Sequence, residues 1–120
     1  MHKIAIDEKF SLFDDRWRPK TVAELNGQEV KLVKVEGTFP WHSHADVDEL
    51  FLVWRGRLRI AFRDHVLDLG PGEMAVVPRG VEHRTAAETE AEILIIEPRG
   101  IVNTGDVVDA RFTSPGRQTI

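Results

Sequence analysis

The amino-acid sequence predicts an all-β protein, built as a sandwich or barrel of short strands. Turn-forming Gly, Pro and Asn residues recur about every 6–12 residues beyond position 26, and this spacing is typical of all-β sandwiches and barrels. No stretch has the 3.6-residue apolar period of an amphipathic helix. A chain of 120 residues with 42% hydrophobic residues fits one domain with an ordinary core.

The first 28 residues are the least regular part of the chain, and we expect them to form an irregular N-terminal arm, residues 1–28. Ser11 is a candidate N-cap for a short helical turn, which Pro19 would end. The dipeptide Asn26-Gly27 predicts a tight turn. The regular part of the fold therefore begins at position 29.

The predicted strands are alternating or continuously apolar runs that lie between turn residues. They span residues 29–36, 50–53, 57–62, 66–69, 73–77, 81–86 and 91–97. We expect a barrel over residues 29–102, because small barrels of about eight strands can enclose one small ligand. The weakly patterned residues 103–120 are expected to form a C-terminal tail of the same domain.

The predicted strand that begins at Glu49 has two different faces. Glu49, Phe51 and Val53 share one face because side chains alternate along a strand. A carboxylate that points inward from so apolar a strand needs a partner or a metal ion, since burying it alone is costly.

The opposite face of that strand carries apolar side chains directed away from the expected cavity. These residues are Leu50, Leu52 and Trp54. A second sheet or another subunit would cover such a face. We therefore expect a homodimer.

Three histidines and this glutamate are candidate metal ligands. His42 and His44 project from one face of an extended segment because they are two residues apart, and Glu49 and His83 complete the set. Nitrogen and oxygen ligands suit one divalent transition metal ion, namely Mn, Fe, Ni, Cu or Zn. Taken singly, the histidines could instead form hydrogen bonds at a rim, and Glu49 could be a solvated strand end.

Further candidates for acid–base chemistry lie at the ends of predicted strands. Glu97 and Glu36 each end a strand, and Arg99 follows Glu97 closely. Each of the three has the alternative of a solvated strand terminus. Trp41 precedes the first ligand, where it would either form a wall of the pocket or pack on the rim.

Composition argues against several other classes of function. The formal net charge of −4 does not fit a protein whose main partner is nucleic acid. No run of 18 apolar residues predicts a membrane span, the N-terminus lacks the apolar region of a secretory signal, and cysteine is absent. A cytoplasmic location is the corresponding expectation. No nucleophile elbow, phosphate loop or dinucleotide fingerprint is present.

Two segments resemble the conserved motifs of the cupin superfamily, in particular its small single-domain, metal-binding members. They are Gly37-x4-His42-x-His44-x4-Glu49-x6-Gly56 and Gly72-x5-Pro78-x-Gly80-x2-His83, separated by 15 residues. The first motif has four residues rather than the usual five between its glycine and its first histidine. The second lacks its usual terminal asparagine, which is Ala87 here. Neither departure affects a ligand.

This resemblance implies a double-stranded β-helix, or jelly-roll barrel, with one metal ion held by His42, His44, Glu49 and His83. The implied function is metal-dependent action on a small organic substrate. The reaction would be isomerisation or epimerisation through carbonyl polarisation, or dioxygenation if the metal is iron. Such sequences are loosely described as mannose-6-phosphate-isomerase-like, although no phosphate-binding cluster is evident here.

Two other functions compete with this interpretation. One is a non-catalytic barrel that uses the metal to anchor a small molecule, and the other is a metal-free jelly roll. An ionisable side chain in the cavity, beyond the four ligands, would favour catalysis over binding.

Overall fold

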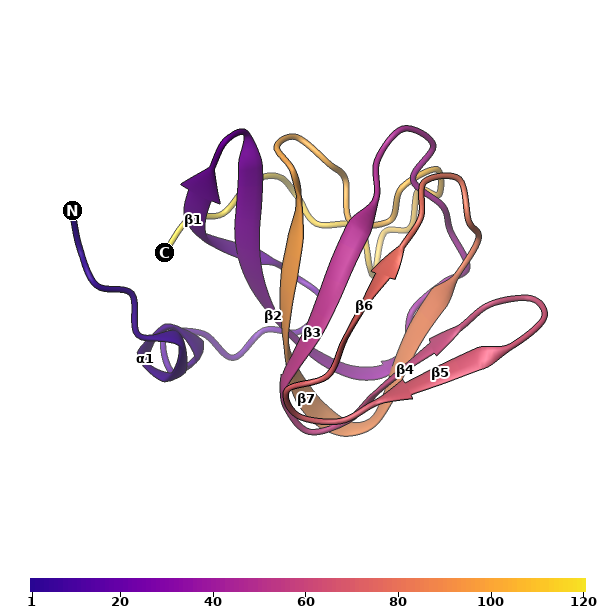
Figure 1. Ribbon diagram of the computed structural model, residues 1–120, viewed down its shortest axis with the longest axis horizontal. Helices are drawn as coiled ribbons and strands as arrows, with labels where there is room; N and C mark the ends of the chain where they lie inside the picture. Colours follow the sequence, from indigo (N-terminus) through magenta and orange to yellow (C-terminus); the bar gives the residue numbers. More distant parts are fainter.

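Seven strands surround a common core in the computed structural model, which describes residues 1–120 (Figure 1). The elements are α1 (Ile6–Phe10), β1 (Lys20–Leu25), β2 (Gln28–Thr38), β3 (Glu49–Arg55), β4 (Leu58–Ala61), β5 (Val66–Leu69), β6 (Met74–Val77) and β7 (Arg84–Pro98). Every strand pairing is antiparallel. The predicted all-β jelly-roll fold is confirmed.

The long strand β7 joins the two halves of the barrel. Its first residues pair with β4 and with the end of β2, whereas its second half pairs with β2 on one side and β3 on the other. The main path of the sheet is β1-β2-β7-β3-β6, and the β4–β5 hairpin attaches through β7.

One continuous strand replaces two that the sequence predicted. Strand β7, which begins at Arg84, contains residues 84–86 of the first predicted strand (81–86) and all of the second (91–97). No Gly or Pro lies between residues 81 and 97, so nothing there breaks the extended chain. Its exposed residues 88–90 let β7 pass the end of the barrel without interruption.

The expectation of an irregular arm over residues 1–28 was wrong in two places. Residues 6–10 form α1, which Ser11 follows as C-cap rather than preceding it as N-cap. Lys20–Leu25 form β1, which pairs with β2. The predicted turn at Asn26-Gly27 is confirmed, because both residues have positive φ (51° and 79°) and connect these two strands.

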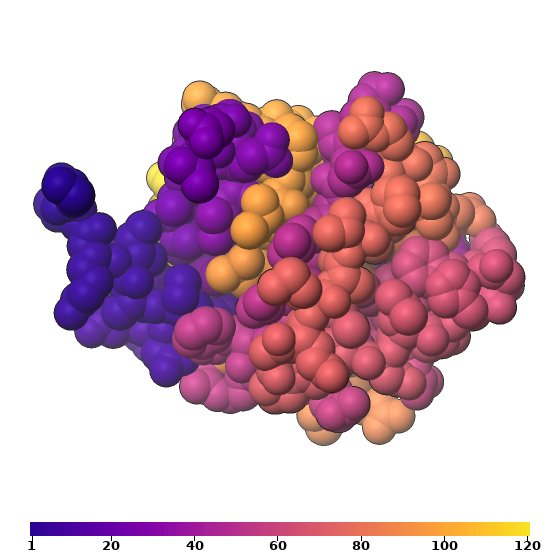
Figure 2. Space-filling model, in the orientation of Figure 1, coloured from indigo at the N-terminus to yellow at the C-terminus, as the bar shows by residue number.

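Strand β2 is buried on both faces, so it separates two cores. Its inner face contributes to the main core inside the barrel, which also includes Phe51, Val53, Ile60, Ile93 and Ile95. Its outer face carries Leu32, which packs with Phe10 and Phe13 of the N-terminal segment in a second, smaller core. Figure 2 shows that this segment stands at one side of the molecule.

The C-terminal tail contains no helix or strand and passes along one end of the barrel. In Figure 1 it leaves β7, follows the upper end of the barrel and finishes beside β1. Thr119 forms a bridge with Thr21 of β1, and Thr104 is fully buried. The single helix has five residues, far short of the length required to cross a bilayer.

Candidate metal centre

The structure brings His42, His44, Glu49 and His83 together inside the barrel. The two histidines of the first motif lie between β2 and β3, Glu49 is the first residue of β3, and His83 immediately precedes β7. All four are buried, and one ligand atom from each lies within 4.8 Å of the others. The chain therefore gathers three imidazoles and one carboxylate at one point.

Backbone hydrogen bonds position the histidine segments. The N–H of His42 donates to the carbonyl of His83 at 3.0 Å, and the N–H of His83 donates back at 2.9 Å. The Gly80 N–H donates to the His44 carbonyl at 2.8 Å. The turn that precedes His83 in the sequence thus also supports the first motif.

Two of the imidazoles are oriented by carbonyl groups close to them in sequence. The Nδ1 of His42 lies 2.9 Å from the Pro40 carbonyl, and the Nδ1 of His83 lies 2.9 Å from the Val81 carbonyl. A ring N–H at Nδ1 donates to each carbonyl and leaves Nε2 as a lone-pair donor. This is the usual outer-shell arrangement of a metal-binding histidine.

The residues present fit a divalent ion. Glu49 Oε1 lies 3.4 Å from His44 Nε2 and 3.5 Å from His83 Nε2. Atoms that each lie about 2.0–2.2 Å from a common ion are separated by roughly 3–3.5 Å. All three atoms are buried without a hydrogen-bond partner, and a bound cation would satisfy all of them.

The electrostatics of the site favour a neutral His42 and an ionised Glu49. Burial, followed by the neighbouring His83, lowers the pKa of His42 to about 4. Burial by itself would raise the pKa of Glu49, but the polar imidazoles of His44 and His83 beside the carboxylate outweigh burial and hold that pKa below its usual value. These are the protonation states that bind metal.

Glu97 is a third component of the site beside the imidazoles and Glu49. It lies on β7 next to Glu49 of β3, because Ile96 and Leu50, which are adjacent in sequence to these two glutamates, pair with each other across the antiparallel strands. Lys31 Nζ donates to Glu97 Oε1 at 2.9 Å, whereas Oε2 is buried without a partner. Burial and the negative charge of Glu49 raise the pKa of Glu97. Its prediction as a possible solvated strand end is therefore wrong.

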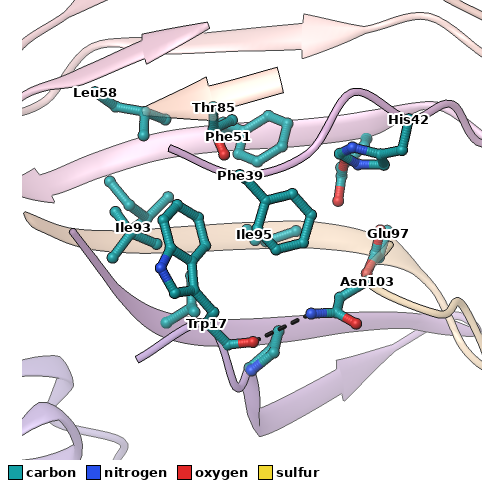
Figure 3. Close-up of a pocket in the computed structure, with 14 residues that line it drawn as sticks. Trp17, Phe39, His42, Phe51, Leu58, Thr85, Ile93, Ile95, Glu97 and Asn103 are labelled. Atoms are coloured by element: carbon teal, nitrogen blue, oxygen red, sulfur yellow. Dashed lines mark hydrogen bonds between the residues drawn. The ribbon is translucent and has the colours of Figure 1, made fainter. Parts of the chain in front are cut away.

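A narrow, largely apolar cavity adjoins the ligands (Figure 3). Its volume of about 40 Å³ has room for a few water molecules. Figure 3 shows His42 and Glu97 toward one end and aliphatic and aromatic side chains toward the other. The lining residues are Trp17, Pro19, Val33, Val35, Phe39, His42, Glu49, Phe51, Leu58, Thr85, Ile93, Ile95, Glu97 and Asn103.

The other predicted site residues lie outside this cavity. Glu36 is exposed and pairs with Arg16, and Arg99 is exposed beside Glu24 and Glu29. Neither is brought to the ligands, because Glu36 points outward at the far end of β2 and Arg99 follows the end of β7. Trp41 lies on the rim, where the Arg63 and Arg84 guanidinium groups contact its ring.

Trp17, Phe39 and Asn103 are among the lining residues that the sequence did not predict. Trp17 and Asn103 come from the two segments expected to be irregular, and the Asn103 side chain donates to the Trp17 carbonyl at 3.1 Å. Phe39 packs edge-on against His42, with ring centroids 5.1 Å apart. The contact between Trp17 and Asn103 depends on how the N-terminal and C-terminal segments pass over the barrel, and no local sequence pattern predicts that path.

An antiparallel barrel that holds a buried cluster of three histidines and one glutamate is typical of one class of proteins. Comparison of this chain with known protein families identifies that class. The family model described as "Cupin domain" matches residues 28–97, more than half of the chain. The chain belongs to this family. The predicted membership is thus confirmed.

Individual relatives agree with this assignment. A cupin-2 domain containing protein from Shewanella frigidimarina is 55% identical, with a TM-score of 0.79 over 80% of this chain and 94% of that one. The uncharacterized protein YdbB from Bacillus subtilis is 35% identical over 78 residues, which cover 64% of this chain and 69% of that protein. Hydroquinone 1,2-dioxygenase from Sphingomonas shares the fold, with 19% identity and a TM-score of 0.65 over 77% and 71% of the two chains.

Proposed function

We propose that this protein is a metal-dependent enzyme that acts on a small, mainly apolar organic molecule carrying an oxygen donor. The carrying observation is that two of the four candidate ligands, His42 and Glu49, line a cavity that is otherwise lined mainly by hydrophobic side chains, and that Glu49 Oε1 is buried there without a hydrogen-bond partner. A divalent ion held by His42, His44, Glu49 and His83 supplies Lewis acidity when bound.

Glu97 favours catalysis over simple binding. It is an ionisable group in the cavity beyond the four ligands, and its Oε2 is buried and free of hydrogen bonds. Lys31 holds the other oxygen, so the carboxyl group is fixed in place. Glu97 is therefore positioned to exchange a proton with a ligand in the cavity, as isomerisation or epimerisation of a carbonyl compound requires.

The cavity does not favour a phosphorylated sugar. No Arg or Lys lines it, and the nearest buried cation, Lys31, is already paired with Glu97. Recognition of a phosphate dianion needs such donors. Dioxygenation is the second candidate reaction for an iron-loaded protein, since the hydroquinone 1,2-dioxygenase from Sphingomonas has the same fold.

Elemental analysis of protein purified without added metal tests the metal site. We expect close to one transition metal ion per chain in the wild type and a large loss in His44→Ala. Asp46→Ala is the control, because Asp46 is exposed in the same loop and is not a ligand. Wild-type protein that remains free of metal even after incubation with Mn²⁺, Fe²⁺, Ni²⁺, Cu²⁺ or Zn²⁺ would refute the proposal.

Calorimetric titration with two probes tests the ligand class. The metal-loaded protein should bind catechol, a small apolar chelator, and should not bind mannose 6-phosphate. The opposite ranking would contradict the proposed substrate class. Catalysis and binding are then separated by mass spectrometry of the incubated ligand, because a purely binding barrel returns it unchanged.

A further inference from the structure

Ser43, between the two histidines of the first motif, has both backbone polar groups bonded to one residue of the tail. The Ser43 N–H donates to Asp106 Oδ1 at 2.8 Å, and the Asp106 N–H donates to the Ser43 carbonyl at 3.1 Å. On either side of Ser43, the backbone of His42 is hydrogen-bonded to His83 and the backbone of His44 to Gly80. The ligand segment 42–44 is thus held from two sides, and the tail supplies one of them.

Gly105 brings the tail into close contact with this segment. Its φ is +58°, and a Cβ built on it would lie 2.1 Å from the Ser43 carbonyl oxygen and 3.2 Å from His44 Nδ1. No side chain fits in that space. His44 is also the ligand whose Nδ1 has no carbonyl partner of the kind that orients His42 and His83. The backbone of Gly105 occupies that side of the His44 ring instead.

The tail is itself firmly attached to the barrel. The Arg18 guanidinium donates to the carbonyls of Arg111, Phe112 and Thr113. The Phe112 ring packs on Trp17 and Phe39, with centroids 5.7 and 5.2 Å away. These contacts give residues 103–113, which we name the C-terminal clamp, a fixed position from which to act on the ligand segment.

We propose that the C-terminal clamp belongs to the metal centre, with Gly105 and Asp106 as positioning residues that set the orientation of His44. The clamp lies outside the part of the chain that matches the family model, which ends at residue 97. This inference rests on the proposed metal-dependent function. Neither residue contacts the ligand atoms directly, so both act through Ser43 and the His44 ring.

Zn²⁺ affinity measured by competition with a chromogenic chelator tests the clamp in the full-length protein. Asp106→Ala removes the acceptor for the Ser43 N–H, and we expect about 10-fold weaker binding, the usual size of an outer-shell effect. Asp106→Asn keeps an oxygen acceptor and should stay within about twofold of wild type. Asp46→Ala, an equal change of charge at a nearby exposed position, is the matched control.

Two further measurements separate positioning from general destabilisation. Electron paramagnetic resonance of the Cu²⁺-loaded protein should show altered nitrogen coupling in Asp106→Ala and a wild-type spectrum in Asp106→Asn. Gly105→Ala should weaken Zn²⁺ binding at least as much as Asp106→Ala. Unchanged affinity and spectra in both Asp106→Ala and Gly105→Ala would overturn the clamp alone, whereas a wild type that binds no ion would overturn the metal centre as well.

Discussion

At the scale of single residues, three buried carboxylates form one row across neighbouring strands. Glu29 of β2 pairs directly with Glu97 of β7, and Glu49 of β3 occupies the next place in that row. Each must be paired with a cation or keep its proton, because an isolated buried charge is costly. Glu29 has Arg117 at 2.9 Å and Glu97 has Lys31 at 2.9 Å. For Glu49 the corresponding cation is the proposed metal ion.

Glu97→Gln should change how the stability of the metal-free protein depends on pH. The folded protein keeps the Glu97 proton above the ordinary pKa of 4.5, because burial and Glu49 raise its pKa, whereas the unfolded chain releases it. Wild-type stability therefore contains a contribution that is present below pH 4.5 and is lost as the pH rises. We expect Glu97→Gln to gain roughly 1–3 kcal/mol relative to wild type between pH 5 and pH 8.

Urea unfolding of chelator-treated protein at the two pH values measures this difference. Glu82→Gln is the control, since hydrogen bonding with Arg63 lowers the pKa of this exposed residue and confines its effect to acidic pH. Parallel pH profiles for wild type and Glu97→Gln would show that the Glu97 pKa is not raised.

Residue-level features of the site were predictable where a motif fixes the spacing. The spacing of His42, His44, Glu49 and His83 along the chain is enough to place all four in one set of candidate ligands. The burial of Glu97 was only half predictable. Alternation placed it on the face of Ile93 and Ile95, but its depth depends on Lys31, which lies 66 residues earlier in the sequence.

At the scale of elements, the N-terminal segment is attached through a separate small core. Phe10 is 1% exposed and contacts Phe13 and the outer face of β2. Helix α1 has only five residues, too few to be stable alone. It therefore depends on the packing of this core and not on the barrel interior.

Phe10→Ala should release this segment while leaving the metal centre intact. A buried Phe→Ala change costs about 3–5 kcal/mol when the site cannot relax, and detachment of the segment would reduce that cost. We expect faster hydrogen exchange confined to residues 6–13 and unchanged Zn²⁺ affinity. Leu12→Ala, at an exposed position of the same segment, should alter neither. Loss of metal binding in Phe10→Ala would show that the two cores are coupled.

The strands were predictable to the extent that Gly and Pro separate them. The predicted strand 66–69 coincides with β5, and the predictions for β2, β3, β4 and β6 overlap the observed strands. Strand β1 was missed because its sequence, KTVAEL, is polar and only partly buried, so its pairing with β2 determines its structure. A register shift lies between Val35 and Gly37, directly before the four-residue spacing of the first motif.

At the scale of the whole molecule, one outer face of the sheet presents apolar side chains with no covering layer. Val76 and Met74 of β6 are 55% and 56% exposed, and they pair with the half-buried Leu50 and Leu52 of β3. Ile96 and Leu94 of β7 continue the same rows, which end where Leu94 packs against the small core of the N-terminal segment. Trp54, expected on this face, instead donates to Asp7 of the N-terminal segment.

We propose that this face pairs two copies of the chain, as the apolar pattern of β3 predicts. An isologous contact suits it, because flat rows of uncharged side chains are complementary to themselves under a twofold axis.

Light scattering should give twice the mass of the chain for the wild type. Val76→Glu should shift the protein to the monomer, because a dimer would bury two facing carboxylates. Val108→Glu, at a 94% exposed position of the tail, should remain dimeric. A monomeric wild type at micromolar concentration would refute this assembly without affecting the metal centre, whose four candidate ligands all come from one chain.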